Sequence, residues 1–276
     1  MDRILKKLAV VTSALLIATA CGSLHAQTLI LLQGYLGSGN AWRETGVTSQ
    51  LERSGWVDAG ELSLMGGQVA GMRNAPDHGR RFVTVALPTE APMMVQEQIL
   101  TAYVARLRSG YPEDSLALVG HSAGGVVARL YMVRHPDIPV SLLVTIASPN
   151  RGTESAEIGL MAGQSPLGWI APWLGAGVLN RSQGLYYDLA RENPGNLLGW
   201  LNRQPHPESV YVSVVRRKDG GLLGMGDMVV PDWSQDLNGV IALRGRARTV
   251  YSDEGHGLSS GDGEVLLYIL ESLRRV

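Results

Sequence analysis

The sequence contains only one cysteine, Cys21, and almost no excess of charge of either sign: 24 Lys and Arg residues stand against 25 Asp and Glu residues, for a net charge of −1. Because it has no Lys/Arg cluster that could neutralise a run of phosphates, a nucleic-acid partner is not expected. Internal repeats and low-complexity tracts are also absent. What is present is an ordinary globular balance of 45% hydrophobic and 18% charged residues over 276 positions, enough to bury a sizeable core.

Residues 1–26 have the layout of a secretory signal peptide. Basic residues within the first seven positions precede an apolar run over 8–20, which is short for a membrane-spanning helix. A polar stretch then leads to Ala26, a small residue that suits a cleavage site. We therefore predict a secreted or periplasmic mature domain of residues 27–276.

Cys21 supports a second interpretation of the same leader. The stretch Ala18-Thr19-Ala20-Cys21 loosely resembles a bacterial lipoprotein box, with Ala18 where leucine is usual. In that case the protein would be anchored to a membrane through a lipid on Cys21. If cleavage follows Ala26 instead, the mature chain has no cysteine, so stability must come from packing alone, without a disulfide or a Cys-ligated metal.

From residue 28 onwards, apolar runs alternate with helical patterns. The runs predict strands over 28–33, 81–87, 115–119, 140–146 and 210–215, and the helical patterns lie over 50–53, 95–107, 124–134 and 265–273. Strands that are apolar on both faces and alternate with helices indicate an α/β fold, with a mostly parallel central sheet covered by helices on both faces. Ligands of such folds bind at the carboxyl ends of the strands.

The segment 157–204 interrupts this alternation. It is rich in Trp and Leu, has no strand pattern, and is broken by Gly and Pro. We expect it to be a helical cap or lid inserted at the strand-end face, where Leu167, Trp169, Ile170 and Trp173 would contact an apolar substrate and, transiently, a membrane or lipid-droplet surface. The alternative is that these residues pack a subdomain core, as buried Trp and Leu commonly do.

The candidate nucleophile is Ser122. It lies in Gly120–Gly124, which matches G-x-S-x-G and comes between a predicted strand and a predicted helix. Glycines flank such a serine because the strand-to-helix turn is tight and strained. The pattern occurs again at Gly257–Gly261, but Ser259 follows no predicted strand, and no acid and histidine come after it in order.

A serine hydroxyl needs a base, and in this arrangement the partners follow in the order Ser, acid, His. Of the six histidines, His256 alone lies in a loop after both Ser122 and the candidate acids, so it is the predicted base. Asp227 is the preferred acid, because it stands in a loop before the apolar stretch that ends at Pro231. Asp219 is the alternative.

The negative oxygen of a tetrahedral intermediate needs fixed N–H donors. One should be the backbone N–H of Ala123, the residue after the serine. The other should come from the loop Gln33–Gly37 after the first strand. We expect the N–H of Tyr35, with Leu36 as the alternative.

With these residues placed, the chain resembles the lipase and esterase branch of the α/β-hydrolases. The matching stretches are Gln33–Gly37, Gly120–Gly124, Thr145–Thr153, and Gly226–Pro231 together with His256. The stretch Thr145–Thr153 is similar to the TPHRGT motif of bacterial triacylglycerol lipases and of glycosylphosphatidylinositol deacylase-like proteins. Gln33 and Asn150 each replace a histidine that is usual in these motifs, which leaves the subfamily open.

The resemblance implies a secreted serine esterase or lipase that hydrolyses carboxylic esters, with lipid or other apolar esters as substrates, through an acyl-enzyme on Ser122. It implies no cofactor. Some bacterial lipases of this branch bind calcium, but no matching ligand set occurs here, so no metal is predicted. A thioesterase or amidase with the same three residues, or a non-catalytic lipid-binding protein of this fold, are the alternatives.

Overall fold

The computed structural model describes residues 27–76, 78–153, 181–217, 227 and 229–274. The predicted leader, Cys21, Asp219 and the four named lid residues lie outside these ranges, so they stay predictions. Among the described helices, none is both long and apolar enough to span a bilayer.

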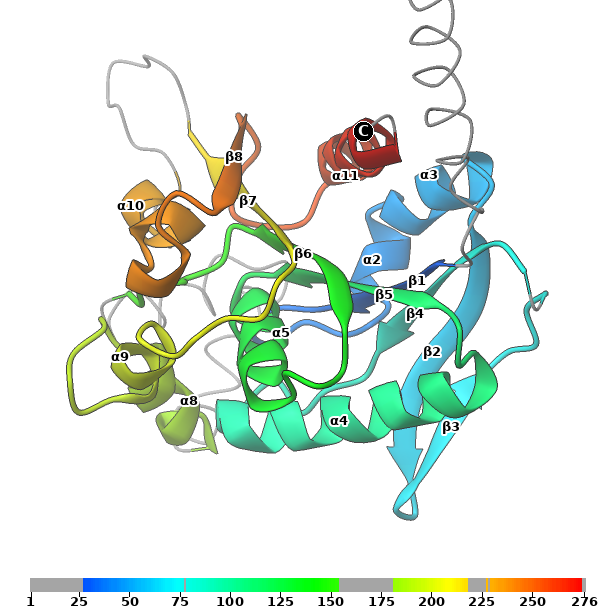
Figure 1. Cartoon of the computed structure of the whole chain (residues 1–276), viewed down its shortest axis with the longest axis horizontal. Coiled ribbons are helices and arrows are strands. Elements are labelled where there is room, and N and C mark those ends of the chain that lie inside the picture. Colours follow the sequence, from blue (N-terminus) through cyan, green and yellow to red (C-terminus); the bar gives the residue numbers. More distant parts are fainter. Residues whose placement is uncertain (1–26, 77, 154–180, 218–226, 228, 275–276) are drawn as a thin grey trace, which may run out of the picture.

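An eight-stranded sheet forms the centre of the molecule (Figure 1). Its spatial order is β3-β2-β4-β1-β5-β6-β7-β8, and every neighbouring pair is parallel except β2 and β3. The strands are β1 Gln27–Leu32, β2 Val57–Met65, β3 Gln68–Met72, β4 Arg80–Val85, β5 Ser115–His121, β6 Val140–Ile146, β7 Val210–Arg216 and β8 Ala247–Ser252. The predicted mostly parallel sheet is therefore confirmed.

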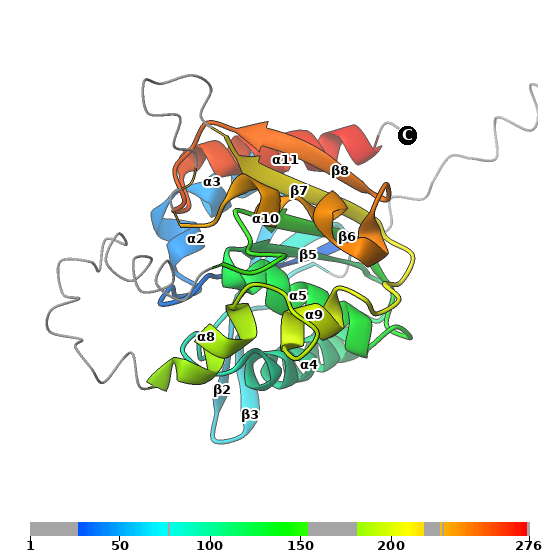
Figure 2. The same ribbon diagram turned by 90° about the vertical axis from the view of Figure 1, so that its left-hand side faces the viewer.

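Helices cover both faces of the sheet, as predicted (Figures 1 and 2). One face packs against α4 Met93–Gly110, α5 Ala123–Arg134, α8 Gln183–Leu189 and α9 Leu197–Leu201. The other packs against α2 Ala41–Glu44, α3 Val47–Arg53 and α11 Ser260–Arg274. The short helices α10 Asp232–Gln235, η2 Leu237–Gly239 and η3 Ile241–Leu243 lie between β7 and β8 in the chain.

Side-chain alternation along the central strands explains the two apolar layers. In β1, Ile30 and Leu32 belong to the layer under α4 and α5, whereas Leu29 and Leu31 belong to the layer under α3 and α11. Successive side chains of a strand point to opposite faces, so a strand that is apolar at every position can fill both layers. Continuous apolar runs in the sequence therefore marked the strands at the middle of the sheet.

Three strands, β2, β3 and β8, were missed by the sequence analysis. All three lie toward the edges of the sheet and mix apolar with polar residues, with burial patterns that are largely exposed or intermediate. In β2, Asp58 is paired with Arg43 at 2.9 Å and with Arg73 at 3.1 Å. Charged residues of this kind interrupt the apolar run by which a strand buried on both faces is recognised, so such a strand is not predicted from the sequence.

The described part of the expected insertion, residues 181–204, contains α8 and α9 and one bridge between Thr153 and Ala190. It packs on the α4 side of the sheet (Figure 2). Leu198 and Leu201 are fully buried in the main core, whereas Trp200 is exposed. These two leucines therefore pack as core residues.

Candidate active site

Ser122 occupies a sharp turn between the end of β5 and the start of α5. Its φ of 51° and ψ of −127° lie far from helical or strand values. Only three described non-glycine residues have a positive φ, and Ser122 is one of them, with Leu36 and Ala147. A strained conformation of this kind costs about 1–3 kcal/mol and persists at sites where the surrounding structure enforces it. Here the Ser122 N–H donates to the carbonyl oxygen of Ile146 at 2.8 Å.

The glycines on either side of the turn are required by close backbone contacts. A Cβ on Gly120 would lie 2.4 Å from the backbone of Gly125, and a Cβ on Gly124 would lie 2.4 Å from the carbonyl oxygen of Gln33. Real Cβ atoms do not approach other atoms this closely, so both positions exclude any side chain. The G-x-S-x-G pattern thus reflects the packing of the turn against itself and against the loop after β1.

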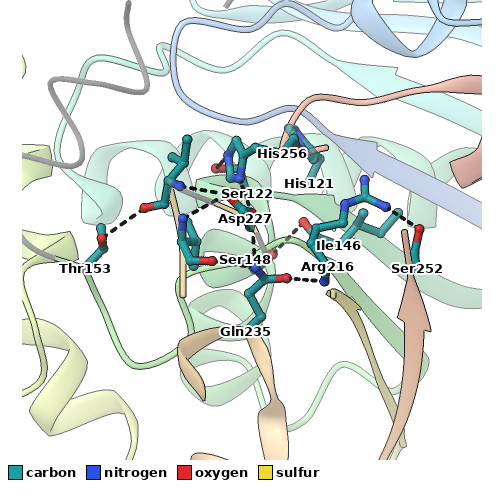
Figure 3. Close-up of polar contacts among 12 residues, drawn as sticks. His121, Ser122, Ile146, Ser148, Thr153, Arg216, Asp227, Gln235, Ser252 and His256 are labelled. Carbon is teal, nitrogen blue, oxygen red and sulfur yellow. Dashed lines mark hydrogen bonds and ion pairs between the residues drawn. The ribbon is translucent and has the colours of Figure 1, made fainter. Parts of the chain in front are cut away.

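His256 bridges Ser122 and Asp227 (Figure 3). Its Nε2 lies 3.1 Å from the Ser122 Oγ, and its Nδ1 lies 2.6 Å from the Asp227 Oδ2. These residues come from segments separated by 134 and 29 positions. The structure therefore brings together the three residues that the sequence analysis selected as nucleophile, base and acid.

The Asp227 carboxylate is held by several donors in addition to the imidazole. Its Oδ1 accepts the backbone N–H groups of Val229 at 2.8 Å and Val230 at 3.1 Å. Its Oδ2 accepts an amide N–H of Gln235 at 3.1 Å. The side chain is fully buried, so these donors take the place of water around its charge.

This arrangement determines which imidazole nitrogen carries the proton. A carboxylate can only accept, so the Nδ1 of His256 must donate to Asp227. In the neutral ring the Nε2 is then an acceptor, and it faces the Ser122 hydroxyl. Such an imidazole can take the hydroxyl proton while the buried carboxylate stabilises the charge that develops on the ring.

His121 fixes the loop that carries the base. Its Nε2 lies 2.7 Å from the backbone carbonyl oxygen of His256, and because a carbonyl only accepts, this nitrogen donates. Burial, followed by the neighbouring His256, lowers the pKa of His121 from 6.5 to about 4. The His121 ring is therefore neutral near pH 7 and acts as a fixed donor.

Replacing His121 with glutamine should reduce the acid sensitivity of the fold. A group whose pKa is lower in the folded state than in the unfolded state contributes stability above its unfolded pKa. That contribution is lost as the pH falls from 6.5 toward 4. Glutamine keeps an N–H donor but does not titrate. In urea unfolding at pH 7 and at about pH 4.5, the wild type should lose about 2–3 kcal/mol more of its unfolding free energy than the variant.

The buried His206, whose pKa is also lowered, is present in both proteins and cancels from this comparison. Parallel losses of unfolding free energy in the wild type and the His121→Gln variant would show that His121 does not titrate as described.

The loop after β1 lies directly against the serine. A Cβ on Gly34 would lie 2.8 Å from the Ser122 Cβ. Within the described residues, the backbone N–H groups of Ala123, Tyr35 and Leu36 donate to no protein acceptor. All three predicted oxyanion donors are thus available, and the geometry does not choose between Tyr35 and Leu36.

The Tyr35 side chain points away from this role and toward α8. Its hydroxyl donates to the Ser182 Oγ at 2.9 Å and lies 2.8 Å from the Tyr186 hydroxyl. Burial is the main reason why the pKa of Tyr35 is raised well above its ordinary value, so the hydroxyl stays protonated. This cluster attaches the loop after β1 to the start of α8.

Ser259, the serine of the second G-x-S-x-G match, and Asp236, another aspartate between β7 and His256, have different surroundings from Ser122 and Asp227. Ser259 lies just before α11, where its N–H donates to Asp262 at 2.9 Å, so it does not form a strained turn after a strand. Asp236 accepts bonds from Asn238 and Thr249 and holds the chain between β7 and β8. No group of three or more His, Cys, Asp or Glu residues that could hold a metal ion occurs in the described part of the chain.

Two contributors to the site were missed by the sequence analysis. Gln235 donates to Asp227. His121, which the sequence analysis did not select as the base, donates to the backbone carbonyl oxygen of His256. The position of His121 inside the G-x-S-x-G motif was a usable signal. For Gln235 no sequence pattern existed, because the contact depends on how the chain turns after β7.

Comparisons with known proteins place one segment of the chain and its overall fold beside known ones. A family model described as the PGAP1-like alpha/beta domain matches residues 75–157, a range that includes Ser122 and the stretch Thr145–Thr153. No curated protein sequence matches the chain.

Three solved structures share the architecture. A gene product of Listeria innocua superposes with a TM-score of 0.59 at 17% identity, covering 89% of this chain and 94% of its own. A mature lipase of Bacillus licheniformis gives 0.58 at 18% identity, covering 91% and 92%. An esterase of Pyrococcus furiosus gives 0.53 at 18% identity, covering 92% and 83%.

The sheet order, the strained serine after β5 and these structural likenesses point to one fold. The fold that the resemblance of the sequence motifs implied is therefore confirmed. The chain has the α/β-hydrolase fold, with a segment, residues 75–157, similar to the PGAP1-like alpha/beta domain.

Proposed function

We propose that the protein is a serine hydrolase of carboxylic esters that acts through Ser122, His256 and Asp227. The observation that carries this proposal is the continuous chain of contacts from the Ser122 Oγ through the His256 ring to the Asp227 carboxylate, at 3.1 and 2.6 Å. The His256 side chain is 17% exposed, so the ring is not fully enclosed by the described residues.

In the first step the Ser122 Oγ attacks the ester carbonyl carbon while His256 Nε2 accepts the hydroxyl proton. The carbonyl electron pair moves onto oxygen, and the resulting oxyanion is stabilised by the N–H of Ala123 and the N–H of Tyr35 or Leu36. When the C–O bond to the alcohol breaks, the protonated imidazole gives its proton to the leaving oxygen. The acyl group remains on Ser122.

In the second step water attacks the acyl-enzyme. His256 accepts a proton from that water, the tetrahedral intermediate collapses, and the imidazolium returns the proton to Ser122 as the carboxylic acid leaves. The Asp227 carboxylate accepts the Nδ1–H and stabilises the charged ring. The proton that leaves with the alcohol is thus replaced by one from water, and His256 carries both.

We further propose an apolar, lipid-like ester as substrate and export of the mature domain. The signal-peptide layout of residues 1–26 supports export. The Trp- and Leu-rich stretch in the sequence and the lipase and esterase among the structural relatives support the substrate class. Thioesters and amides are the alternative substrates for the same three residues.

A matched substrate panel tests the leaving group and the acyl chain together. We expect p-nitrophenyl esters to be hydrolysed, with kcat/KM that rises from acetate toward longer acyl chains. The corresponding p-nitroanilides and acyl thioesters of the same chain length should react more slowly. A preference for the anilide or the thioester at equal acyl length would replace the esterase proposal with an amidase or a thioesterase. Hydrolysis of none of them would favour the non-catalytic alternative.

A further inference from the structure

Both the oxygen and the NH₂ group of the Gln235 side-chain amide form hydrogen bonds in the site (Figure 3). It is the last residue of α10 and is 1% exposed. Its Nε2 donates to the Asp227 Oδ2 at 3.1 Å and to the Val230 carbonyl oxygen at 2.6 Å. Its Oε1 accepts the backbone N–H of Arg216 at 2.8 Å.

These three partners fix which way the amide points. If the amide were rotated by 180°, its oxygen would face the Asp227 carboxylate and the Val230 carbonyl, and its NH₂ would face the N–H of Arg216. Each contact would then pair two acceptors or two donors, so the NH₂ side of the amide must face Asp227.

The anchor of this amide is rigid. Arg216 ends β7, and its buried guanidinium forms an ion pair with Asp262 of α11 at 2.7 Å and donates to the Ser252 hydroxyl at 3.0 Å. The Gln235 amide therefore connects the carboxylate to a strand end that is itself held by β8 and α11.

The two oxygens of Asp227 are held in different ways. Oδ1 accepts two backbone N–H groups from the residues that follow it in the chain, so these donors move with the loop. Oδ2, the oxygen that faces His256, has Gln235 as its other donor among the residues that the structure describes. Gln235 is thus the contact that ties the reacting side of the carboxylate to the sheet.

We propose that Gln235 is a positioning residue, which holds the Asp227 Oδ2 in line with the His256 Nδ1 from its anchor at the end of β7. The proposal rests on the proposed function, because it assigns Gln235 to the same three residues. A small displacement of a group that supports the reacting atoms lowers the rate without changing how substrate binds.

The test is Gln235→Met, which preserves the length of the side chain but has no donor. We expect kcat for a p-nitrophenyl ester to fall roughly 10–100-fold with KM unchanged. The strongly downfield proton signal of the His256 Nδ1–H should shift or broaden, because its acceptor is no longer fixed. This signal is read without substrate, so it tests the positioning separately from the reaction.

Ser234→Ala is the matched control. Ser234 is the neighbouring residue, fully buried, and donates to the Gly152 carbonyl oxygen at 2.7 Å without contacting Asp227. Thermal unfolding should show lower stability for both variants, but only Gln235→Met should lower kcat and change the Nδ1–H signal. Equal effects of both variants on kcat and on the signal would show that Gln235 is merely structural.

Gln235→Glu is a second variant that keeps the acceptor for the Arg216 N–H. Its carboxylate repels Asp227 when ionised and regains an O–H donor when protonated, so the ratio of its kcat to that of the wild type should rise as the pH is lowered. A constant ratio, or wild-type kcat in both Gln235 variants, would overturn the positioning role. A wild type that hydrolyses no ester would overturn the proposed function instead.

Discussion

Replacing Ser122 with alanine is expected to lower kcat for ester hydrolysis by about 10⁶-fold, which corresponds to about 8 kcal/mol of transition-state stabilisation. The physical reason is that the Ser122 Oγ is the atom that forms the acyl bond. Without it, the His256 Nε2, which lies 3.1 Å from that oxygen in the wild type, has no protein nucleophile to activate. The three residues act as a unit, so no partial pathway retains most of the rate.

The fold should survive this change. The variant loses one hydroxyl, whereas the Ser122 N–H bond to Ile146 belongs to the backbone and remains. The measurement is steady-state hydrolysis of a p-nitrophenyl ester, with circular dichroism to verify folding. Ser259→Ala is the control, because Ser259 lies in the second G-x-S-x-G match and should keep full activity. Wild-type activity in folded Ser122→Ala would exclude Ser122 as the nucleophile.

Replacing Asp227 with asparagine should lower kcat by about 10⁴-fold, the loss that the equivalent change causes in a well-studied serine protease. An amide cannot stabilise the imidazolium, and if its NH₂ faces Nδ1, the ring must carry its proton on Nε2, where it cannot accept from Ser122. Because the N–H groups of Val229, Val230 and Gln235 all donate to the carboxylate, an amide in its place leaves at least one of them facing an NH₂ group.

Two other aspartates provide the comparison for this prediction. Asp232→Asn alters an exposed acid in α10. Among the described residues its carboxylate accepts a hydrogen bond only from the neighbouring Trp233 N–H, so the change should affect kcat little. Asp219→Asn tests the acid that the sequence left as an alternative. If Asp219→Asn lowered kcat more than Asp227→Asn does, the contact between His256 and Asp227 would not be the productive one.

How well the fold could be predicted depended on where each strand lies in the sheet. The middle strands β1, β5 and β6 face apolar layers on both sides, and this leaves an unbroken apolar run in the sequence. The outer strands β2, β3 and β8 are partly exposed, so their polar residues concealed them. Pairing at the edge is a tertiary property that a local pattern does not record.

The candidate site could be predicted where local chemistry restricts the residue type. Ser122 could be predicted because its turn excludes side chains at Gly120 and Gly124, and this constraint leaves the G-x-S-x-G pattern in the sequence. His256 followed from chain order. Gln235 could not be predicted, because its role arises from three contacts with residues five, eight and nineteen positions away in the chain.

The most direct test of the central claim is covalent capture of the nucleophile. A fluorophosphonate reacts only with a serine that a neighbouring base has activated, so the folded wild type should gain one adduct, and peptide mass spectrometry should place it on Ser122. The adduct should disappear in Ser122→Ala and form much more slowly in Asp227→Asn. Failure of the folded wild type to react, or an adduct on Ser259 instead, would contradict the assignment of Ser122, His256 and Asp227 as the reacting group.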